Sequence, residues 1–223
     1  EKRLGHKKAL WAELDTAIGL LPVVAVHLDA YATHVQRAEQ LADVLAEVDD
    51  QGFDRVLIGG DHNTTTYDVL NTPRLLWNIL KKGVRGGFPH AMHHYLYPEL
   101  LYEKPIFDEY RRTGLDWESF NEIGVGTSRY EVGTFDSESK VTDQLPSVFA
   151  WYLAKRLKPW NGVAEFRLDW FAAKGLVGVG PTWIDGCRAA ANVVGEPHTA
   201  GQQEQQAKLR SHPIDLRRKP GRA

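Results

Sequence analysis

The sequence predicts an α/β (α+β) fold, in which helices pack against a sheet, and the segment from residue 23 to residue 60 carries most of this prediction. Residues 23–28, Val-Val-Ala-Val-His-Leu, form a short apolar run that is typical of a strand buried on both faces. Residues 33–48 repeat apolar side chains at intervals of three and four, which predicts an amphipathic helix. Residues 55–60 return to the buried-strand pattern. A strand, a helix and a strand in this order form a parallel crossover unit, so we expect His27 and Asp61 to lie near each other.

Weaker signals predict the remaining elements. Partial alternation of apolar and polar residues over 9–15 predicts a half-buried strand, and the turn residues Gly19 to Pro22 predict a hairpin with the strand that follows. Thr33 is expected to cap the first helix. We further expect helices over 73–82 and 146–157, strands over 164–173 and 211–216, a helix or loop over 186–209, and surface excursions with little regular structure over 83–143.

The composition is that of an ordinary globular protein, and the length suits one domain or a large piece of one. The chain has 223 residues, of which 43% are hydrophobic and 25% are charged, and this length allows a sizeable core. The net charge of −2 gives no general attraction to a polyanion, although residues 208–223 carry six Lys or Arg against one Asp. Cys187 is the only cysteine, which excludes an intrachain disulfide and a Cys-rich zinc site. No apolar run approaches the roughly 20 residues that span a bilayer.

The tetrapeptide Gly60-Asp61-His62-Asn63 places a carboxylate and a carboxamide two residues apart at the end of a strand. There Asp61 could bind Mg²⁺ or orient an attacking water, and Asn63 could donate to a phosphoryl oxygen. The same residue types are frequent in ordinary turns, so a structural interpretation stays open. His27 could hold a phosphate oxygen or be a structural histidine at a strand end. Asp169 lies within an apolar strand, where we expect a cation or a histidine as its partner.

Four motifs follow one another along the chain. They are Val26-His27-Leu28-Asp29, a helix that bears Arg37 and Gln40, Gly60-Asp61-His62-Asn63, and Arg167-Leu168-Asp169-Trp170. In order and spacing these motifs resemble the signatures of the endonuclease/exonuclease/phosphatase superfamily, which includes deoxyribonuclease I, apurinic endonucleases, neutral sphingomyelinases and inositol polyphosphate phosphatases. The resemblance implies a deoxyribonuclease I-like two-sheet sandwich flanked by helices. It also implies metal-dependent hydrolysis of phosphate esters, with Mg²⁺ as cofactor or Mn²⁺ in its place.

The resemblance assigns a role to four residues. His27 resembles the family histidine that contacts the scissile phosphate. Asp61 and Asn63 resemble the pair that orients the nucleophilic water and binds the phosphoryl group, and Asp61 is the candidate metal ligand. Asp169 resembles the aspartate that holds a catalytic histidine.

That catalytic histidine normally stands in a Ser-Asp-His motif near the C-terminus. The closest match here is Arg210-Ser211-His212-Pro213-Ile214, which makes His212 the candidate and puts Ser211 where the family has a metal-binding aspartate. His198 is the weaker candidate.

The resemblance further implies an N-terminal part that this sequence does not contain. The family places an early asparagine and a metal-binding glutamate upstream of the region that matches residues 7–15, and neither Glu1 nor Glu13 stands in a similar context. We therefore expect residues 1–216 to be the C-terminal part of one such domain and residues 217–223 to be a basic tail. One apolar face of the sheet should then be under-covered, which favours a partner or self-association.

Two functions stay open at this point. The first is a metal-dependent phosphoesterase, in which Asp61 orients the water that attacks a nucleic acid, a lipid headgroup or a sugar phosphate. The alternative is a catalytically impaired remnant that acts as a binding or scaffold module. The sequence indicates no cellular compartment.

Overall fold

The computed structural model describes residues 8–17, 19–66, 72–131, 155–178, 182–184, 187–189 and 210–215, and its centre is a five-stranded mixed sheet. The strand order is β6-β3-β2-β1-β9. Strands β2 and β3 run parallel, whereas the other neighbouring pairs are antiparallel. Together with the helices of the chain, this sheet confirms the predicted α/β (α+β) class. The five strands are β1 (Lys8–Thr16), β2 (Gly19–His27), β3 (Val56–Asp61), β6 (Asp169–Lys174) and β9 (Arg210–Asp215).

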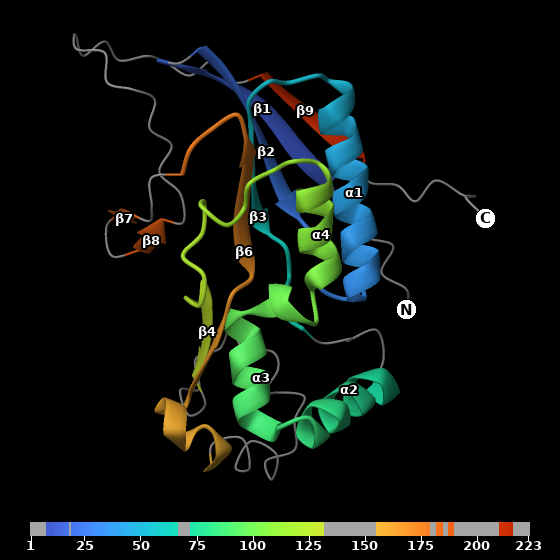
Figure 1. The fold of residues 1–223 in the computed structure, drawn as a ribbon, viewed down its shortest axis with the longest axis vertical. Coiled ribbons are helices and arrows are strands. Elements are labelled where there is room, and N and C mark those ends of the chain that lie inside the picture. Colours follow the sequence, from blue (N-terminus) through green and yellow to red (C-terminus); the bar gives the residue numbers. More distant parts are fainter. Residues whose placement is uncertain are drawn as a thin grey trace.

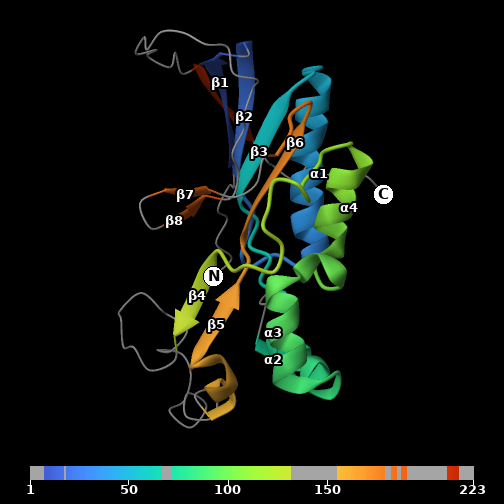
Figure 2. The ribbon, with the colours of Figure 1, turned by 60° about the vertical axis from the view of Figure 1, so that its left-hand side comes forward.

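Helices α1 (His34–Asp50) and α4 (Lys104–Arg112) pack side by side on one face of this sheet (Figures 1 and 2). The apolar spacing of α1 places one side of the helix on the sheet, as the sequence predicts. The strands, α1 and α4 together form the main core, which includes Val24, Val26, Leu41, Val44, Leu45, Ile58, Ile106, Phe107, Tyr110 and Trp170.

The start of α1 is fixed by a capping box. The backbone N–H of Gln36 donates to the Thr33 hydroxyl at 3.3 Å, and the backbone N–H of Thr33 donates to Gln36 Oε1 at 3.0 Å. These two bonds satisfy donors that the first turn of a helix leaves unpaired. The predicted cap at Thr33 is confirmed.

A second group of elements lies beyond one end of the sheet, near the C-terminal ends of β2 and β3 (Figure 1). It contains α2 (Thr72–Val84), α3 (Gly87–Leu96) and the hairpin of β4 (Ser128–Glu131) with β5 (Val163–Phe166). A small core of its own joins α3 to β5 through Ala91, Met92, Tyr95, Leu157 and Ala164. The remaining short elements are η1 (Pro98–Leu100), η2 (Lys158–Trp160), β7 (Thr182–Ile184) and β8 (Cys187–Ala189).

Several predicted elements are confirmed. The first two strands form an antiparallel hairpin, α2 covers the predicted helix over 73–82, and β9 covers the predicted last strand. The hairpin turn was misplaced, because Thr16 already pairs with Gly19 and the residues up to Pro22 belong to β2.

The prediction that β2 is buried on both faces is wrong. Val24 and Val26 are buried beneath the helices, whereas Ala25 between them is exposed. The reason is that α1 and α4 cover only one face. On the other face Leu10 and Ala25 pair and are both exposed, so this face is apolar and open at that point. Self-association through it stays a prediction.

Two further predictions are wrong. The stretch over 83–143 was expected to be irregular, but it contains α3 and α4; α4 is only 9 residues long and buries Ile106, Phe107 and Tyr110. So short a helix shows too few turns for a clear periodic pattern. Residues 164–173 form two strands instead of one, because the chain leaves β5 after Phe166 and enters the central sheet at Asp169.

Two predicted elements fall largely outside the described residues. Of the predicted helix over 146–157, residues 146–154 lie outside, and of the segment 186–209 the described part is the strand β8. The basic tail 217–223 also lies outside. Across the part of the chain that the structure describes, none of the helices combines the length and the hydropathy needed to cross a bilayer.

Candidate active site

Three ionisable side chains stand in one row across the end of the sheet. The register pairs His27 on β2 with Asp61 on β3, and Asp61 with Asp169 on β6. Paired residues on neighbouring strands project from the same face. This face is the one opposite α1 and α4, because the adjacent residues Val26 and Trp170 are buried in the core under the helices. The predicted proximity of His27 and Asp61 is confirmed.

The His27 imidazole and the Asp61 carboxylate are close enough to interact. Their Nε2 and Oδ2 atoms are 3.7 Å apart, with 60% of the His27 side chain and 34% of the Asp61 side chain exposed. Both groups are therefore accessible to a solute. Together they offer a carboxylate that can accept a proton and an imidazole that can donate one.

The two carboxylates of the row face each other across an antiparallel pair. Side chains in such pairs have Cβ atoms roughly 5 Å apart, and like charges placed directly opposite are unfavourable. A cation near Asp61 and Asp169 would relieve this repulsion.

Glycines shape the sheet beneath the row. Gly60 has a φ of 135°, and a Cβ there would lie 2.1 Å from the carbonyl oxygen of Val26. A Cβ at Gly59 would lie 2.3 Å from the ring of Phe171, its partner in the register. The parallel strands can therefore approach, and the Phe171 ring can lie over β3, because neither glycine carries a side chain.

Asn63 lies in the loop after β3 and stabilises it through two hydrogen bonds. Its backbone N–H donates to Asp61 Oδ1 at 2.7 Å, and its side-chain Nδ2 donates to the carbonyl of Leu28 at 2.8 Å. The residue has a φ of 49°, a left-handed conformation that asparagine tolerates better than most residues. Asn63 thus orients the Asp61 carboxylate and joins the ends of β2 and β3. One N–H of the Asn63 side-chain amide donates to the carbonyl of Leu28, and the amide carries a second N–H.

His62 has a structural position in the core. Its Nδ1 lies 2.8 Å from the carbonyl of Gly60, and its Nε2 accepts from the hydroxyl of Tyr110 on α4. The carbonyl can only accept, so Nδ1 carries a proton, and the lowered pKa leaves Nε2 unprotonated near neutral pH. Burial lowers the pKa of His62 to about 4. His62 therefore links the loop after β3 to helix α4 through its hydrogen bond with Tyr110.

Arg37 and Gln40 hold the loop after β2. The side-chain Oε1 of Gln40 accepts from the backbone N–H of Asp29 at 3.0 Å, and Arg37 Nη1 donates to the carbonyl of Ala32 at 2.6 Å. Asp29 Oδ1 in turn accepts from the N–H of Tyr31 at 2.9 Å. These bonds fix the backbone that follows His27.

Arg37 also begins a buried polar network. Its Nη2 donates to Glu103 Oε1 at 2.5 Å, and both side chains are almost fully buried. The same Oε1 accepts from the N–H of Thr66 at 3.1 Å, and Lys82 Nζ donates to the carbonyl of Thr66 at 2.7 Å. Burial raises the pKa of Glu103, and Arg37 partly offsets that shift. The network joins α1, α4, α2 and the loop after β3.

Thr127 and Arg167 position the backbone at Asp169, and no motif in the sequence marks Thr127. The Thr127 hydroxyl oxygen accepts from the backbone N–H groups of Leu168 and Asp169, both at 3.0 Å. Arg167 is buried and donates to the carbonyls of Glu122 and Val125 at 2.6 and 2.8 Å. These contacts fix the two residues between β5 and β6 and so the start of β6.

His212 stands apart from the row. It lies on β9, where it pairs with Trp11, and three strands separate β9 from the β6 strand that carries Asp169. Four strand spacings amount to about 19 Å, well beyond hydrogen-bond reach. The structure therefore does not bring His212 to Asp169. The weaker candidate, His198, lies outside the described residues.

The residues of the row fit a hard cation with few protein ligands. Mg²⁺ is commonly held by one or two carboxylates while it keeps several waters, and Asp61 and Asp169 supply two carboxylates from adjacent strands. Within the described ranges, no group of three or more His, Cys, Asp or Glu could hold a metal ion. The described residues therefore do not form a site with three or more such protein ligands, but they are compatible with an open site in which water supplies most of the ligands.

Comparison with known proteins does not assign a family. No family model and no curated protein matches the chain. Among solved structures it is similar to the crystal structure of beta toxin 275-280 from Staphylococcus aureus, at 14% sequence identity and a TM-score of 0.36. The match covers 82% of this chain and 52% of the toxin chain, so the chain spans about half the length of that structure. An identity and a TM-score this low support neither a family assignment nor a function.

Proposed function

We propose that the chain is part of a metal-dependent phosphoesterase and that its sheet is one layer of a deoxyribonuclease I-like sandwich. One observation carries the proposal. His27, Asp61 and Asp169 come from three separate motifs, yet they form one row on the face of the sheet away from the helices. A row of two carboxylates and an imidazole is suited to the hydrolysis of a phosphate ester.

In the proposed reaction the residues have distinct tasks. Asp61, oriented by the N–H of Asn63, takes a proton from the attacking water as the water oxygen bonds to phosphorus, the ester P–O bond breaks, and the leaving oxygen is protonated by solvent. His27 donates to a phosphoryl oxygen, and the second N–H of the amide of Asn63, a residue that is 7% exposed, is the proposed donor to another. Asp61 and Asp169 would hold Mg²⁺, which when bound supplies charge stabilisation to the equatorial oxygens. The substrate class, whether nucleic acid, lipid headgroup or sugar phosphate, is not chosen by these contacts.

The first experiment measures hydrolysis of bis-p-nitrophenyl phosphate with and without Mg²⁺. We expect Asp61→Asn to lower the Mg²⁺-dependent rate by about 100-fold or more, because a positioned base typically contributes at least that much. Asp43→Asn, at an exposed position on α1, is the matched control and should leave the rate unchanged. Equal rates for both variants would contradict the assignment of Asp61. Absence of turnover even in a chain extended by an N-terminal part would overturn the enzyme proposal.

A second candidate function is a binding module without catalysis. It is favoured by the separation of His212 from Asp169, which lie on β9 and β6 at opposite edges of the sheet. Isothermal titration with a nonhydrolysable phosphodiester distinguishes the two functions. A module would bind the ligand through His27 and show no turnover under any metal condition.

A further inference from the structure

Helix α2 carries an exposed apolar ridge, which we define as Trp77, Leu80 and Val84. The exposed fractions of these side chains are 58%, 56% and 82%. Spacings of three, four and seven residues place them on one side of the helix. The surfaces of monomeric proteins seldom gather large apolar side chains in this way, so the ridge is a candidate contact surface.

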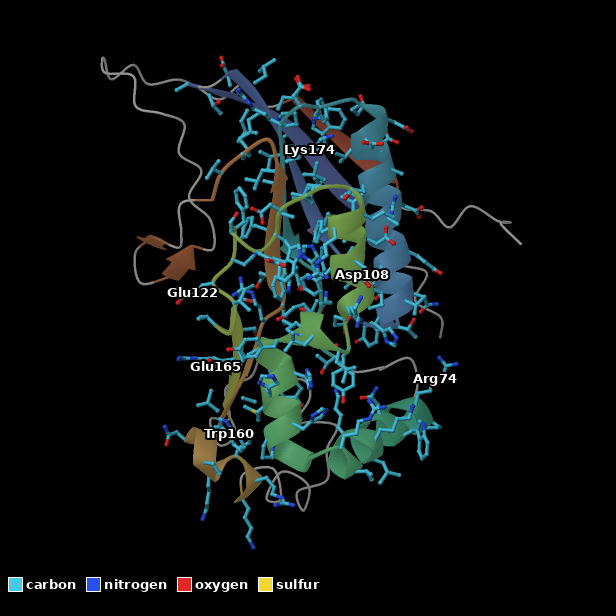
Figure 3. All side chains as sticks on the ribbon, in the orientation of Figure 1. Arg74, Asp108, Glu122, Trp160, Glu165 and Lys174 are labelled. Atoms are coloured by element: carbon cyan, nitrogen blue, oxygen red, sulfur yellow. The ribbon has the colours of Figure 1, made fainter. Side chains whose placement is uncertain are left out.

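The charged residues of the α2 segment are positive. The charged residues between positions 72 and 86 are all Lys or Arg, although the whole chain has a net charge of −2. Lys81 and Arg85 line a shallow hollow together with the ridge, and Lys81 Nζ lies 5.4 Å from the centre of the Trp77 ring. Arg74 projects outward from the first turn of α2 (Figure 3). The ridge is therefore bordered by cations.

The other side of α2 is anchored to the rest of the molecule. Lys82 is 3% exposed, and its Nζ donates to the carbonyl and the hydroxyl of Thr66 at 2.7 and 2.8 Å. The same ammonium group lies 4.6 Å from the centre of the Tyr102 ring. Lys82 stands about 140° around the helix axis from Trp77. Because Lys82 is held inward, the ridge is turned outward.

We propose that α2 docks on the surface of an anionic lipid bilayer, with the ridge in the headgroup region and the cations against the lipid phosphates. Helices with Trp and Leu beside Lys and Arg bind such interfaces in this orientation. At 13 residues, α2 is about 20 Å long, shorter than the roughly 30 Å hydrocarbon core, so it lies along the surface.

The basic border complements an anionic lipid surface. At a membrane the lysine stem lies along apolar surface and its ammonium reaches the lipid phosphates, and the charged residues between positions 72 and 86 are all positive. The position of α2 at one end of the molecule leaves it accessible to a flat surface (Figure 1). The proposal does not depend on the phosphoesterase activity, because it concerns binding alone.

Co-flotation with vesicles tests the proposal, using the full chain and two lipid compositions. The wild-type chain should float with mixed phosphatidylcholine–phosphatidylserine vesicles and not with pure phosphatidylcholine vesicles. Lys81→Gln with Arg85→Gln should weaken binding to the mixed vesicles by about 30-fold, since each cation near an anionic surface contributes about a factor of five. Trp77→Gln with Leu80→Gln should also weaken it, because the apolar anchor is removed.

A matched control replaces an exposed apolar residue and an exposed lysine elsewhere. Val177→Gln with Lys158→Gln should leave vesicle binding unchanged, and circular dichroism checks that every variant is folded. Failure of the folded wild-type chain to float with mixed vesicles would overturn the proposal. So would equal losses in the control and the α2 variants. If the wild-type chain fails to float but forms a dimer that Trp77→Gln abolishes, the ridge is instead an interface between two copies.

Discussion

The buried pair of Arg37 and Glu103 gives the sharpest stability prediction. Arg37→Met would remove the donors that reach Glu103 at 2.5 and 3.4 Å and the donor that reaches the carbonyl of Ala32 at 2.6 Å. The Glu103 carboxylate, about 1% exposed, would then keep the N–H of Thr66 as its described hydrogen-bond donor. Removing one member of a buried ion pair costs about 3 to 5 kcal/mol, so we expect a loss of about 4 kcal/mol in the free energy of unfolding.

Urea denaturation with linear extrapolation measures this loss. In the double variant Arg37→Met with Glu103→Leu, no unpaired charge stays buried, so the loss should be smaller than for Arg37→Met alone by about 2 kcal/mol or more. Arg112→Met is the control, since Arg112 is exposed and pairs with Glu109 at the surface, where an ion pair contributes about 0 to 1 kcal/mol. A loss below about 1 kcal/mol for Arg37→Met, or additive losses in the double variant, would refute this reasoning.

Three further predictions concern the scaffold of the site. Burial lowers the pKa of Lys82 from 10.5 to about 7. As the pH falls, the unfolded chain therefore binds this proton at a higher pH than the folded chain does. The free energy of unfolding should consequently fall by about 2 kcal/mol between about pH 9 and about pH 7. Lys82→Met should flatten that slope in thermal or urea unfolding, and Lys81→Met should not. Gly59→Ala, whose Cβ would lie 2.3 Å from the Phe171 ring, should cost about 1 to 3 kcal/mol by overpacking, and adding Phe171→Ala should recover part of it. Thr127→Val should cost about 1 kcal/mol, because the N–H groups of Leu168 and Asp169 lose their acceptor, whereas Thr127→Ser should retain stability.

The proximity of His27 and Asp61 is predictable from the sequence because both residues end strands of a single strand–helix–strand unit. When a helix connects two parallel strands of one sheet, the connection is almost always right-handed. Once β2 and β3 are parallel neighbours, their C-terminal ends meet, and the pairing of His27 with Asp61 follows without knowledge of any other part of the chain.

The position of Asp169 is not predictable in the same way. Its pairing with Asp61 depends on where β6 starts, and that start depends on the Thr127 hydroxyl and the buried Arg167 guanidinium. These contacts join residues more than 40 positions apart, so no local pattern reveals them. The resemblance of Arg167-Leu168-Asp169-Trp170 to a family motif marked Asp169, but it implied a histidine partner where the register shows a second carboxylate.

His62 shows why residue type alone cannot separate function from structure. In the sequence it stands between Asp61 and Asn63 and is as plausible a catalytic histidine as His27. Burial lowers the pKa of His62 to about 4 and so keeps it neutral, and Tyr110 of α4, a helix that the sequence did not predict, is its hydrogen-bond partner. Because strand residues alternate between faces, Asp61 points away from the helices while His62 points toward them. The proposed chemistry of the row therefore depends on His27, Asp61 and Asp169. His62 lies outside the row and holds the loop after Asp61 against α4.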